Sequence, residues 1–358
     1  MTPRRILLAQ TSFLGDVVLT TPLWRALRTS LPGTDVWWLV RPDAVPIVAP
    51  LAGTDRVLAF DKRGGDGGLG GLGRVAARLR ALDFDVAIAV QRSLRTAVTL
   101  ALAGIPERIG FAGAAGSPLY HHRVAHRGRH ARDRLLALAA PLGVAPDPPP
   151  DPELATDAAA AESVAAALAA AGVAADEPLL VVAPGAAWET KRWPAERYAE
   201  LVRALVPGTF AHAAVVGTAA DRGHAASIVR RMEQAGSGAA VVDLTGRTTT
   251  AELVAVLARA GLLVANDSAP AHVAAAFGRP VVSLFGPTVP AQGFAPLGAH
   301  VRVLERTLSC RPCSRHGTAW CPIGTHECLA GIAPADVAAT AQSMLATAAE
   351  PNRAGGVA

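Results

Sequence analysis

Long hydrophobic runs are absent from this chain of 358 residues. No stretch approaches the roughly 20 apolar residues that a membrane-spanning helix needs, and the Ala-rich segment 158–175 is too short and too weakly apolar. The first residues place two Arg before an apolar run, as signal peptides do. However, Gln10 interrupts that run, Asp16 ends it, and no small-residue cleavage site follows. We therefore expect a buried first strand in a soluble, cytoplasmic protein whose cysteines are reduced.

Lysine is nearly absent, because Lys62 and Lys191 are the only two among 34 Lys and Arg residues. No run of basic residues marks a nucleic-acid-binding arm, so we expect no nucleic-acid partner. The formal net charge of +5 suits an anionic substrate or a phosphate-bearing membrane surface, although many proteins with neither carry such a charge. Where almost every cation is Arg, each remaining Lys is a candidate for a specific role.

Short apolar runs alternate with helical patterns throughout the chain. Strands are expected at 6–9, 36–40, 56–60, 86–90, 108–111, 179–183, 213–217, 240–243, 262–265 and 281–285. Helices are expected at 17–30, 74–82, 94–103, 194–206, 221–234, 250–260, 269–277 and 334–349. Strands that are apolar on both faces and alternate with helices indicate parallel sheets covered on both sides.

A Pro-rich stretch at 144–153 reads as a stiff connector between two halves. We therefore predict an α/β protein with domains at 1–150 and 151–335, followed at 336–358 by a helix that crosses back to the first domain and a disordered tail. Each domain is expected to be doubly wound and Rossmann-like, with the active site in a cleft between them. The Gly-rich stretch 64–73 reads as a flexible loop, either a surface insertion or a lid on the acceptor side.

Asp16 follows the first predicted strand, in a turn that lacks the GxGxxG dinucleotide fingerprint. It stands next to Gly15 at the start of a helix. One interpretation is a carboxylate that the helix dipole favours at this position. The other is a general base at the carboxyl end of a strand. Composition alone favours the first interpretation.

Lys191 lies in the loop that follows the first strand of the second half, just before Pro194. Proline suits the first turn of a helix, so Lys191 is expected at the carboxyl edge of the sheet. A cation there could neutralise a pyrophosphate. It could equally be an ordinary exposed lysine.

Residues 265–272 end a predicted strand and open a helix, with Asp267 or Ser268 as the cap and Pro270 in the first turn. The free backbone N–H groups of such a helix start form an anion site, or the segment is simply a well-made helix start. His272 lies one turn into the helix. It reads as a buried structural residue or as a contact to phosphate or ribose.

The four cysteines follow in a cluster, Cys310, Cys313, Cys321 and Cys328, with His316 and His326 among them. One CxxC pair with two further Cys could bind a structural zinc. The spacings differ from the usual paired knuckles, so free buried thiols are the alternative.

Taken together, these motifs resemble those of the ADP-heptose:lipopolysaccharide heptosyltransferases, glycosyltransferase family 9. The resemblance extends over nearly the whole chain, and the Cys-rich tail is most similar to the heptosyltransferase II branch. It rests on the segments 14–22, 85–111, 184–186, 191–194, 266–272 and 284–288 and on Cys321-Pro322 with His326-x-Cys328.

The resemblance implies a GT-B fold, an inverting glycosyl transfer and no cofactor for catalysis. It implies Asp16 as the catalytic base. The donor site that it implies comprises Lys191, Asp221, Thr248, Asp267, Ser268, Ala269 and His272. We expect Gly15, Arg92, Arg95 and Arg123 to bind the acceptor. Arg127 and Arg129 could bind it too, and some of these arginines are expected to be solvated surface charge. One departure is Ala269, where the family usually has Gly, which places a methyl group near the pyrophosphate.

The expected reaction transfers heptose from ADP-L-glycero-D-manno-heptose to the phosphorylated inner core of lipopolysaccharide. The enzyme would then work at the cytoplasmic face of the inner membrane, in peripheral contact with it. Alternatives are a sugar-nucleotide epimerase of similar build, for which Glu107, His121 and His122 could supply acid and base groups, a transferase for another nucleotide sugar or acceptor, and a two-domain solute-binding protein.

Overall fold

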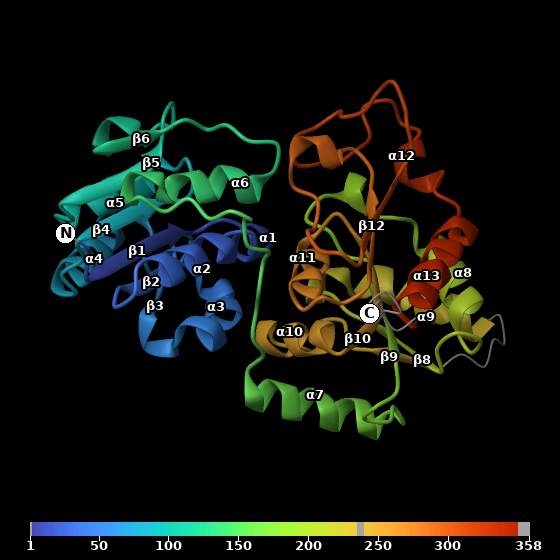
Figure 1. Ribbon diagram of the computed structural model, residues 1–358. Coiled ribbons are helices and arrows are strands. Elements are labelled where there is room, and N and C mark those ends of the chain that lie inside the picture. Colours follow the sequence, from blue (N-terminus) through green and yellow to red (C-terminus); the bar gives the residue numbers. More distant parts are fainter. Residues whose placement is uncertain (1, 235–239, 350–358) are drawn as a thin grey trace, which may run out of the picture. The chain divides into compact units, whose positions relative to one another are not determined.

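The computed structural model describes residues 2–234 and 240–349 (Figure 1). The chain divides between Ala155 and Thr156 into two compact units. Over the described ranges, no helix is both long and apolar enough to cross a membrane.

The first unit contains a parallel sheet in the order β3-β2-β1-β4-β5-β6. Its described strands are β1 (Arg5–Gln10), β2 (Asp35–Val40), β3 (Val57–Ala59), β4 (Val86–Ala89), β5 (Glu107–Phe111) and β6 (His122–Val124). Its described helices are α1 (Leu14–Val18), α2 (Thr21–Ser30), α3 (Val45–Ala52), α4 (Gly68–Ala81), α5 (Leu94–Leu102) and α6 (Ala131–Leu136). The apolar run of β1 is fully buried, as a central parallel strand requires.

The helix expected at 17–30 is two helices, α1 and α2. Pro22 has no backbone N–H to donate to the carbonyl of Val18, so the helical ladder breaks there. The hydroxyl of Thr21 donates to that carbonyl instead, at 2.8 Å. The prediction of one continuous helix at 17–30 was therefore wrong near its start, where α1 ends at Val18 and α2 begins at Thr21.

The prediction of a flexible loop at 64–73 was also wrong in part. Residues from Gly68 onward form the first turns of α4. Leu72, Val75 and Leu79 are buried on one face of this helix. Their packing outweighs the poor helix propensity of the glycines.

The second unit repeats the architecture with a parallel sheet in the order β12-β11-β10-β7-β8-β9. Its described strands are β7 (Leu179–Ala183), β8 (His212–Val215), β9 (Ala240–Asp243), β10 (Ala260–Asn266), β11 (Val281–Phe285) and β12 (Val301–Glu305). Its described helices are α7 (Ala158–Ala170), α8 (Ala195–Leu205), α9 (Arg222–Gln234), α10 (Thr250–Ala258), α11 (Ala269–Ala276), α12 (Glu327–Ala330) and α13 (Pro334–Ala349).

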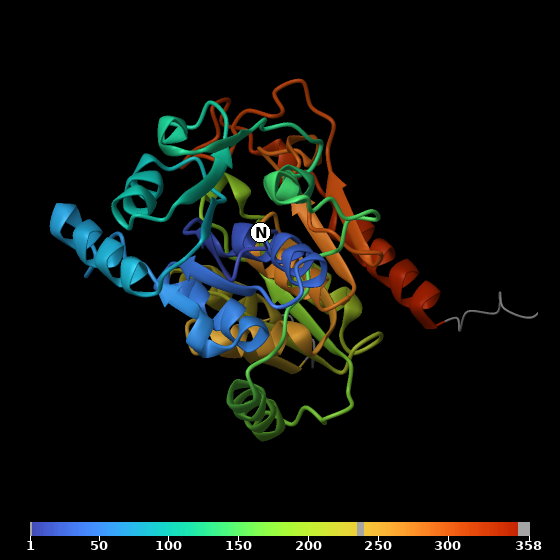
Figure 2. The same cartoon turned by 60° about the vertical axis from the view of Figure 1, so that its left-hand side comes forward.

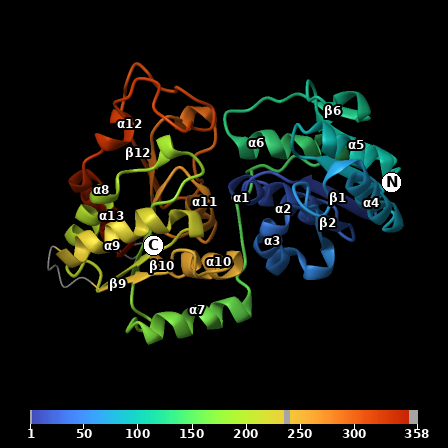
Figure 3. The same cartoon turned by 180° about the vertical axis from the view of Figure 1, so that it is seen from behind.

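Helices cover both faces of the second sheet. Alternate residues of β7, such as Leu180 and Val182, belong to a buried cluster with Trp193, Tyr198 and residues of α8, α9 and α13. Figure 3 shows these three helices next to one another. The intervening residue Val181 is also fully buried, so both faces of β7 are covered. The expected doubly wound α/β fold is therefore confirmed.

The last described helix, α13, is one continuous segment that packs against α8 and β11 of the second unit (Figure 2). Its bounds agree with those expected from the sequence. The expectation that it crosses back to the first domain stays a prediction, and the expected tail at 350–358 lies outside the described residues.

Both sheets have the same order when each is numbered from its own first strand. In each, the order reverses beside the first strand, between β1 and β4 and between β7 and β10. Doubly wound sheets bind their ligands at the carboxyl ends of the strands at such a switch point. The fold therefore singles out the loops after these four strands.

Candidate active site

In the first unit, Asp16 belongs to the loop and helix that follow β1. It lies in the first turn of α1 and is half-buried. Its backbone carbonyl accepts a hydrogen bond from the Thr20 hydroxyl at 2.7 Å and one from the Gln10 side-chain amide at 3.3 Å. The structure thus places Asp16 at the switch point, the position expected for a residue that acts on a bound ligand.

The expected acceptor residues lie around the same edge. Gly15 precedes Asp16 in α1, while Arg92 and Arg95 follow β4. Arg92 donates to the carbonyl of Gly113 at 2.6 Å, and Arg95 donates to the carbonyl of Asp66 at 2.5 Å. Both cations are thus held by neutral backbone oxygens, which leaves their charge available to an anion.

Arg123 is separated from these residues along the sheet. It is exposed on β6, the edge strand, opposite Gly110 of β5. The structure therefore brings Gly15, Arg92 and Arg95 to the switch-point strands and places Arg123 at the sheet edge.

In the second unit, Lys191 and Asp267 come from the loops after β7 and β10. The Lys191 ammonium lies 2.5 Å from an oxygen of the Asp267 carboxylate, and both side chains are largely buried. The Thr288 hydroxyl donates to the same carboxylate oxygen at 2.6 Å. Lys191 is therefore no ordinary surface lysine. It is held in one place at the switch point by a carboxylate partner.

Asp221 is a buried carboxylate just after β8. One oxygen lies 3.0 Å from the Arg192 guanidinium, and the other accepts from the backbone N–H and hydroxyl of Thr218 at 2.9 and 2.7 Å. A Cβ atom on Gly185 would lie 2.5 Å from this carboxylate, so the loop after β7 can pass here only as glycine. Asp221 thus fixes the packing of two neighbouring loops.

Asn266, the last residue of β10, holds together the loops at this edge of the sheet. The sequence predicted it only as part of the segment 265–272 and not as a site residue by itself. Its side-chain oxygen accepts from the backbone N–H of Trp193 at 3.0 Å and from the Tyr198 hydroxyl at 3.1 Å. Its amide donates to the carbonyl of Pro184 at 2.8 Å. Its position directly before Asp267 was one indication of a role at the site. Its hydrogen-bond partners, however, are far away in the sequence and could not be predicted.

The start of α11 differs from the expected helix cap. Ser268 occupies the N-cap position, yet its hydroxyl donates to the carbonyl of Asn266 at 3.2 Å and caps no helix N–H. Ala269 is the first helical residue, and His272 is buried one turn in. The amides at this helix start therefore have no side-chain cap from Ser268, which suits an anion.

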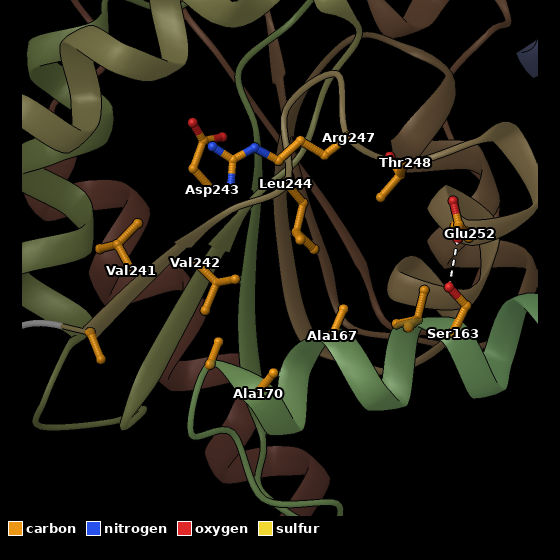
Figure 4. Close-up of a pocket in the computed structure, with 13 residues that line it drawn as sticks. Ser163, Ala167, Ala170, Val241, Val242, Asp243, Leu244, Arg247, Thr248 and Glu252 are labelled. Carbon is orange, nitrogen blue, oxygen red and sulfur yellow. Dashed lines mark hydrogen bonds between the residues drawn. The ribbon is translucent and has the colours of Figure 1, made fainter.

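Thr248 lies in a different part of the second unit. It lines a pocket of about 630 Å³ between α7 and β9, together with Ala167, Val242, Leu244 and Glu252 (Figure 4). Glu252 accepts from the Ser163 hydroxyl at 2.7 Å across this pocket. The lining of this pocket includes none of the other expected donor residues.

The cysteines lie together beyond β12. All four line one small cavity of about 30 Å³. Burial raises the pKa of the Cys313 and Cys328 thiols, whereas the pKa of Cys321 is lowered, mainly by a hydrogen bond from the backbone of His326. Within residues 2–234 and 240–349, however, no group of three or more His, Cys, Asp or Glu side chains is arranged to hold a metal ion.

The family model for glycosyltransferase family 9 (heptosyltransferase) matches residues 72–322. The lipopolysaccharide heptosyltransferase 1 of Pseudomonas aeruginosa is 30% identical over 86% of this chain and 86% of its own length. The lipopolysaccharide heptosyltransferase 2 of Salmonella typhimurium is 27% identical over 95% of this chain and 98% of its own. The solved structure of the E. coli ADP-heptose lipopolysaccharide heptosyltransferase II covers 97% of this chain and all of its own, with a TM-score of 0.81 and 23% identity. This chain belongs to glycosyltransferase family 9, the heptosyltransferase family, and is a glycosyl-transferring enzyme with the GT-B fold.

Proposed function

We propose that this enzyme transfers heptose from ADP-L-glycero-D-manno-heptose to the inner core of lipopolysaccharide. The observation that carries the proposal is the placement of Asp16 and of the Lys191–Asp267 pair at the switch points of two doubly wound sheets. Membership of the heptosyltransferase family supports the choice of sugar. The description of the E. coli relative as an ADP-heptose enzyme supports the choice of nucleotide.

Asp16 is proposed as the general base of an inverting transfer. Its carboxylate takes the proton of the acceptor hydroxyl as that oxygen forms a bond to the anomeric carbon of heptose. The bond from the anomeric carbon to the ADP oxygen breaks in the same displacement. ADP leaves with the electron pair, and the configuration at the anomeric carbon inverts.

Lys191 is proposed to bind the donor pyrophosphate. Its ammonium has three N–H donors, and the contact with Asp267 uses one of them. The pair therefore fixes the direction of the ammonium and leaves two donors for phosphate oxygens. The uncapped amides at Ser268 and Ala269 would bind the same anion, with His272 one turn further on. Charge that develops on ADP as it leaves is stabilised by these groups.

Asp221 and Thr248 remain candidates for binding the nucleoside part of the donor. Both oxygens of Asp221 already accept hydrogen bonds or pair with Arg192. A ribose hydroxyl would therefore have to share these acceptors. Thr248 would contribute only to a ligand that reaches the pocket beside β9.

Arg92, Arg95 and Arg123, with Gly15, are proposed to bind the phosphorylated acceptor. Guanidinium groups match the geometry of phosphate oxygens. Because the lipopolysaccharide acceptor is anchored in lipid, the enzyme would work in peripheral contact with the cytoplasmic face of the inner membrane. Vesicles that carry the acceptor should bind the enzyme, and plain vesicles of the same charge should not.

The cysteine cluster is proposed to be structural and to take no part in transfer. The four thiols line one small cavity, so a structural zinc is the alternative to free thiols. Elemental analysis of the metal content distinguishes free thiols from a zinc-bound cluster. Reduced thiols without metal match the present geometry, whereas one zinc per chain that is lost in the variant Cys310→Ser/Cys313→Ser would establish the metal.

No specific observation favours the epimerase alternative. Glu107 and His122 lie 3.0 Å apart and pair with each other on the surface. Glu107 begins β5, so it stands at the end of the sheet away from the switch-point loops. The imidazole of His121 accepts a hydrogen bond from the backbone N–H of Arg108 at 3.2 Å.

One experiment tests the proposed reaction against its alternatives. The protein is incubated with ADP-heptose alone and then with an inner-core acceptor, and the products are identified by mass spectrometry. Release of ADP together with an acceptor heavier by one heptose is the expected result. Conversion of the donor without acceptor would indicate an epimerase, and binding without turnover would indicate a solute-binding protein. A panel of nucleotide sugars in the same assay tests the donor.

A further inference from the structure

The loop that carries Asp16 is anchored by an amide side chain from within the sheet. Gln10 is the last residue of β1, and only 3% of it is exposed. Its side-chain oxygen accepts from the backbone N–H of Ser12 at 3.2 Å. Its amide nitrogen donates to the carbonyl of Asp16 at 3.3 Å and to the Thr20 hydroxyl at 3.0 Å. One side chain therefore binds both ends of the turn at 11–15, which leads into Asp16.

A second glutamine holds the same turn from the loop after the neighbouring strand, β4. The side-chain oxygen of Gln91 accepts from the Ser12 hydroxyl at 2.8 Å. Its amide nitrogen donates to the Thr11 hydroxyl and, at 2.8 Å, to the hydroxyl of Thr96 in α5. Since Gln91 follows β4, these bonds tie the loops on the two sides of the switch point together.

Apolar packing contributes little to fixing this turn. Phe13, at its centre, is 58% exposed, and Ser12, Leu14 and Gly15 are not fully buried. Both glutamines instead satisfy buried or partly buried polar groups. A fully buried polar group left without a partner costs about 1–3 kcal/mol. The position of the turn is therefore set by hydrogen bonds from two side chains that each carry both a donor and an acceptor.

We infer that Gln10 and Gln91 are positioning residues for catalysis, which hold the turn at 11–15 so that the Asp16 carboxylate meets the acceptor hydroxyl. The inference rests on the proposed role of Asp16 as base. Gln10 acts through the carbonyl of Asp16, and Gln91 acts through Thr11 and Ser12. Misplacing a catalytic group by about 1 Å costs about 100-fold in rate.

The test compares Gln10→Ala and Gln91→Ala in the wild-type and Asp16→Asn backgrounds, with single-turnover transfer as the readout. Each glutamine variant should lower the rate about 10- to 100-fold in the wild-type background and leave the residual rate of Asp16→Asn unchanged. The acidic limb of the pH profile should stay in place, and ADP-heptose affinity should not change. Restoring an amide as Gln91→Asn should recover part of the rate.

Thr34→Ala is the matched control, because Thr34 is a buried residue of the same unit whose hydroxyl donates to the carbonyl of Pro3 at 2.8 Å. It should leave the rate unchanged. Equal losses in the two backgrounds, or no loss in the wild-type background, would overturn the inference. If the Asp16→Asn variant itself keeps its turnover, the proposal that Asp16 is the base is wrong. That outcome differs from a failure of the inference about the two glutamines. Should Gln10→Ala fail to fold, the half-buried Gln91 carries the test.

Discussion

Lys62 is a half-buried cation whose pKa is lowered to about 8. Burial is the main cause, and the charge of Arg95 adds to it. The ammonium donates to the Thr96 hydroxyl at 2.9 Å and lies 5.2 Å from the centre of the Phe60 ring. The unfolded chain, with a lysine pKa of about 10.4, binds more protons than the folded chain between pH 8 and 10. The charged Lys62 side chain therefore lowers the free energy of unfolding at neutral pH. This loss becomes smaller as the pH rises through that window.

Replacing this cation by an apolar side chain of similar length should stabilise the protein at neutral pH. The variant Lys62→Met is expected to raise the melting temperature at pH 7, with a gain that shrinks between pH 8 and about 10. Thermal unfolding across that pH range measures it. Arg63→Met, a change at an exposed neighbour, should show no such trend. Parallel curves for Lys62→Met and the wild type would refute the lowered pKa.

Lys191 is expected to contribute both to the stability of the fold and to donor binding, and two variants can separate these effects. Lys191→Ala leaves the Asp267 carboxylate without its cation, so it should lower stability by about 3–5 kcal/mol as well as weaken ADP binding. The pair Lys191→Met with Asp267→Asn removes both charges, so it should recover stability but not ADP affinity. Exposed Arg203 on α8 provides the control Arg203→Ala. If the double variant binds ADP as the wild type does, Lys191 has no role in the donor site.

At the scale of elements, Asn266 holds the loops after β7 and β10 in register. Asn266→Leu would leave the N–H of Trp193 and the carbonyl of Pro184 without a partner, and the hydroxyl of Tyr198 with only a 3.5 Å contact to the carbonyl of Ala183. At about 1–3 kcal/mol for each buried group left without a partner, the loss should be a large part of the stability of a typical domain. Denaturant unfolding is the measurement. Ser268→Ala, which removes a single bond to the carbonyl of Asn266, should cost far less; a similar loss from both would contradict the account.

The central strands could be predicted from the sequence because they are apolar on both faces. The edge strands β6 and β12 were missed, since residues such as Arg123 and Arg302 face solvent there and break the apolar run. Lys191 and Asp267 were predicted as site residues from their places after strands. Their contact was not, because it joins loops 76 residues apart in number (267 − 191). The roles of Gln10 and Gln91 likewise depend on partners that only the folded sheet brings together.

At the scale of the molecule, one topology occurs twice with different residues at the switch point. The first unit places a carboxylate and arginines there, and the second places a lysine and the start of α11. This difference in chemistry supports a division of labour, with base and acceptor groups on the first unit and donor groups on the second. Substitution of a site residue in the first unit should therefore lower the transfer rate and leave donor affinity unchanged, whereas substitution of a site residue in the second unit should weaken donor binding and also slow the departure of ADP.

The most direct test is the pair of measurements on Asp16→Asn, transfer at saturating acceptor and affinity for ADP-heptose. The amide keeps the shape of the side chain but cannot take the acceptor proton. The account predicts a rate lower by about 10²–10⁴ with donor affinity unchanged. Asp55→Asn, at an exposed carboxylate of the same unit, should change neither quantity. Near wild-type turnover of Asp16→Asn would contradict the account and leave Asp16 as a residue that only favours the start of α1.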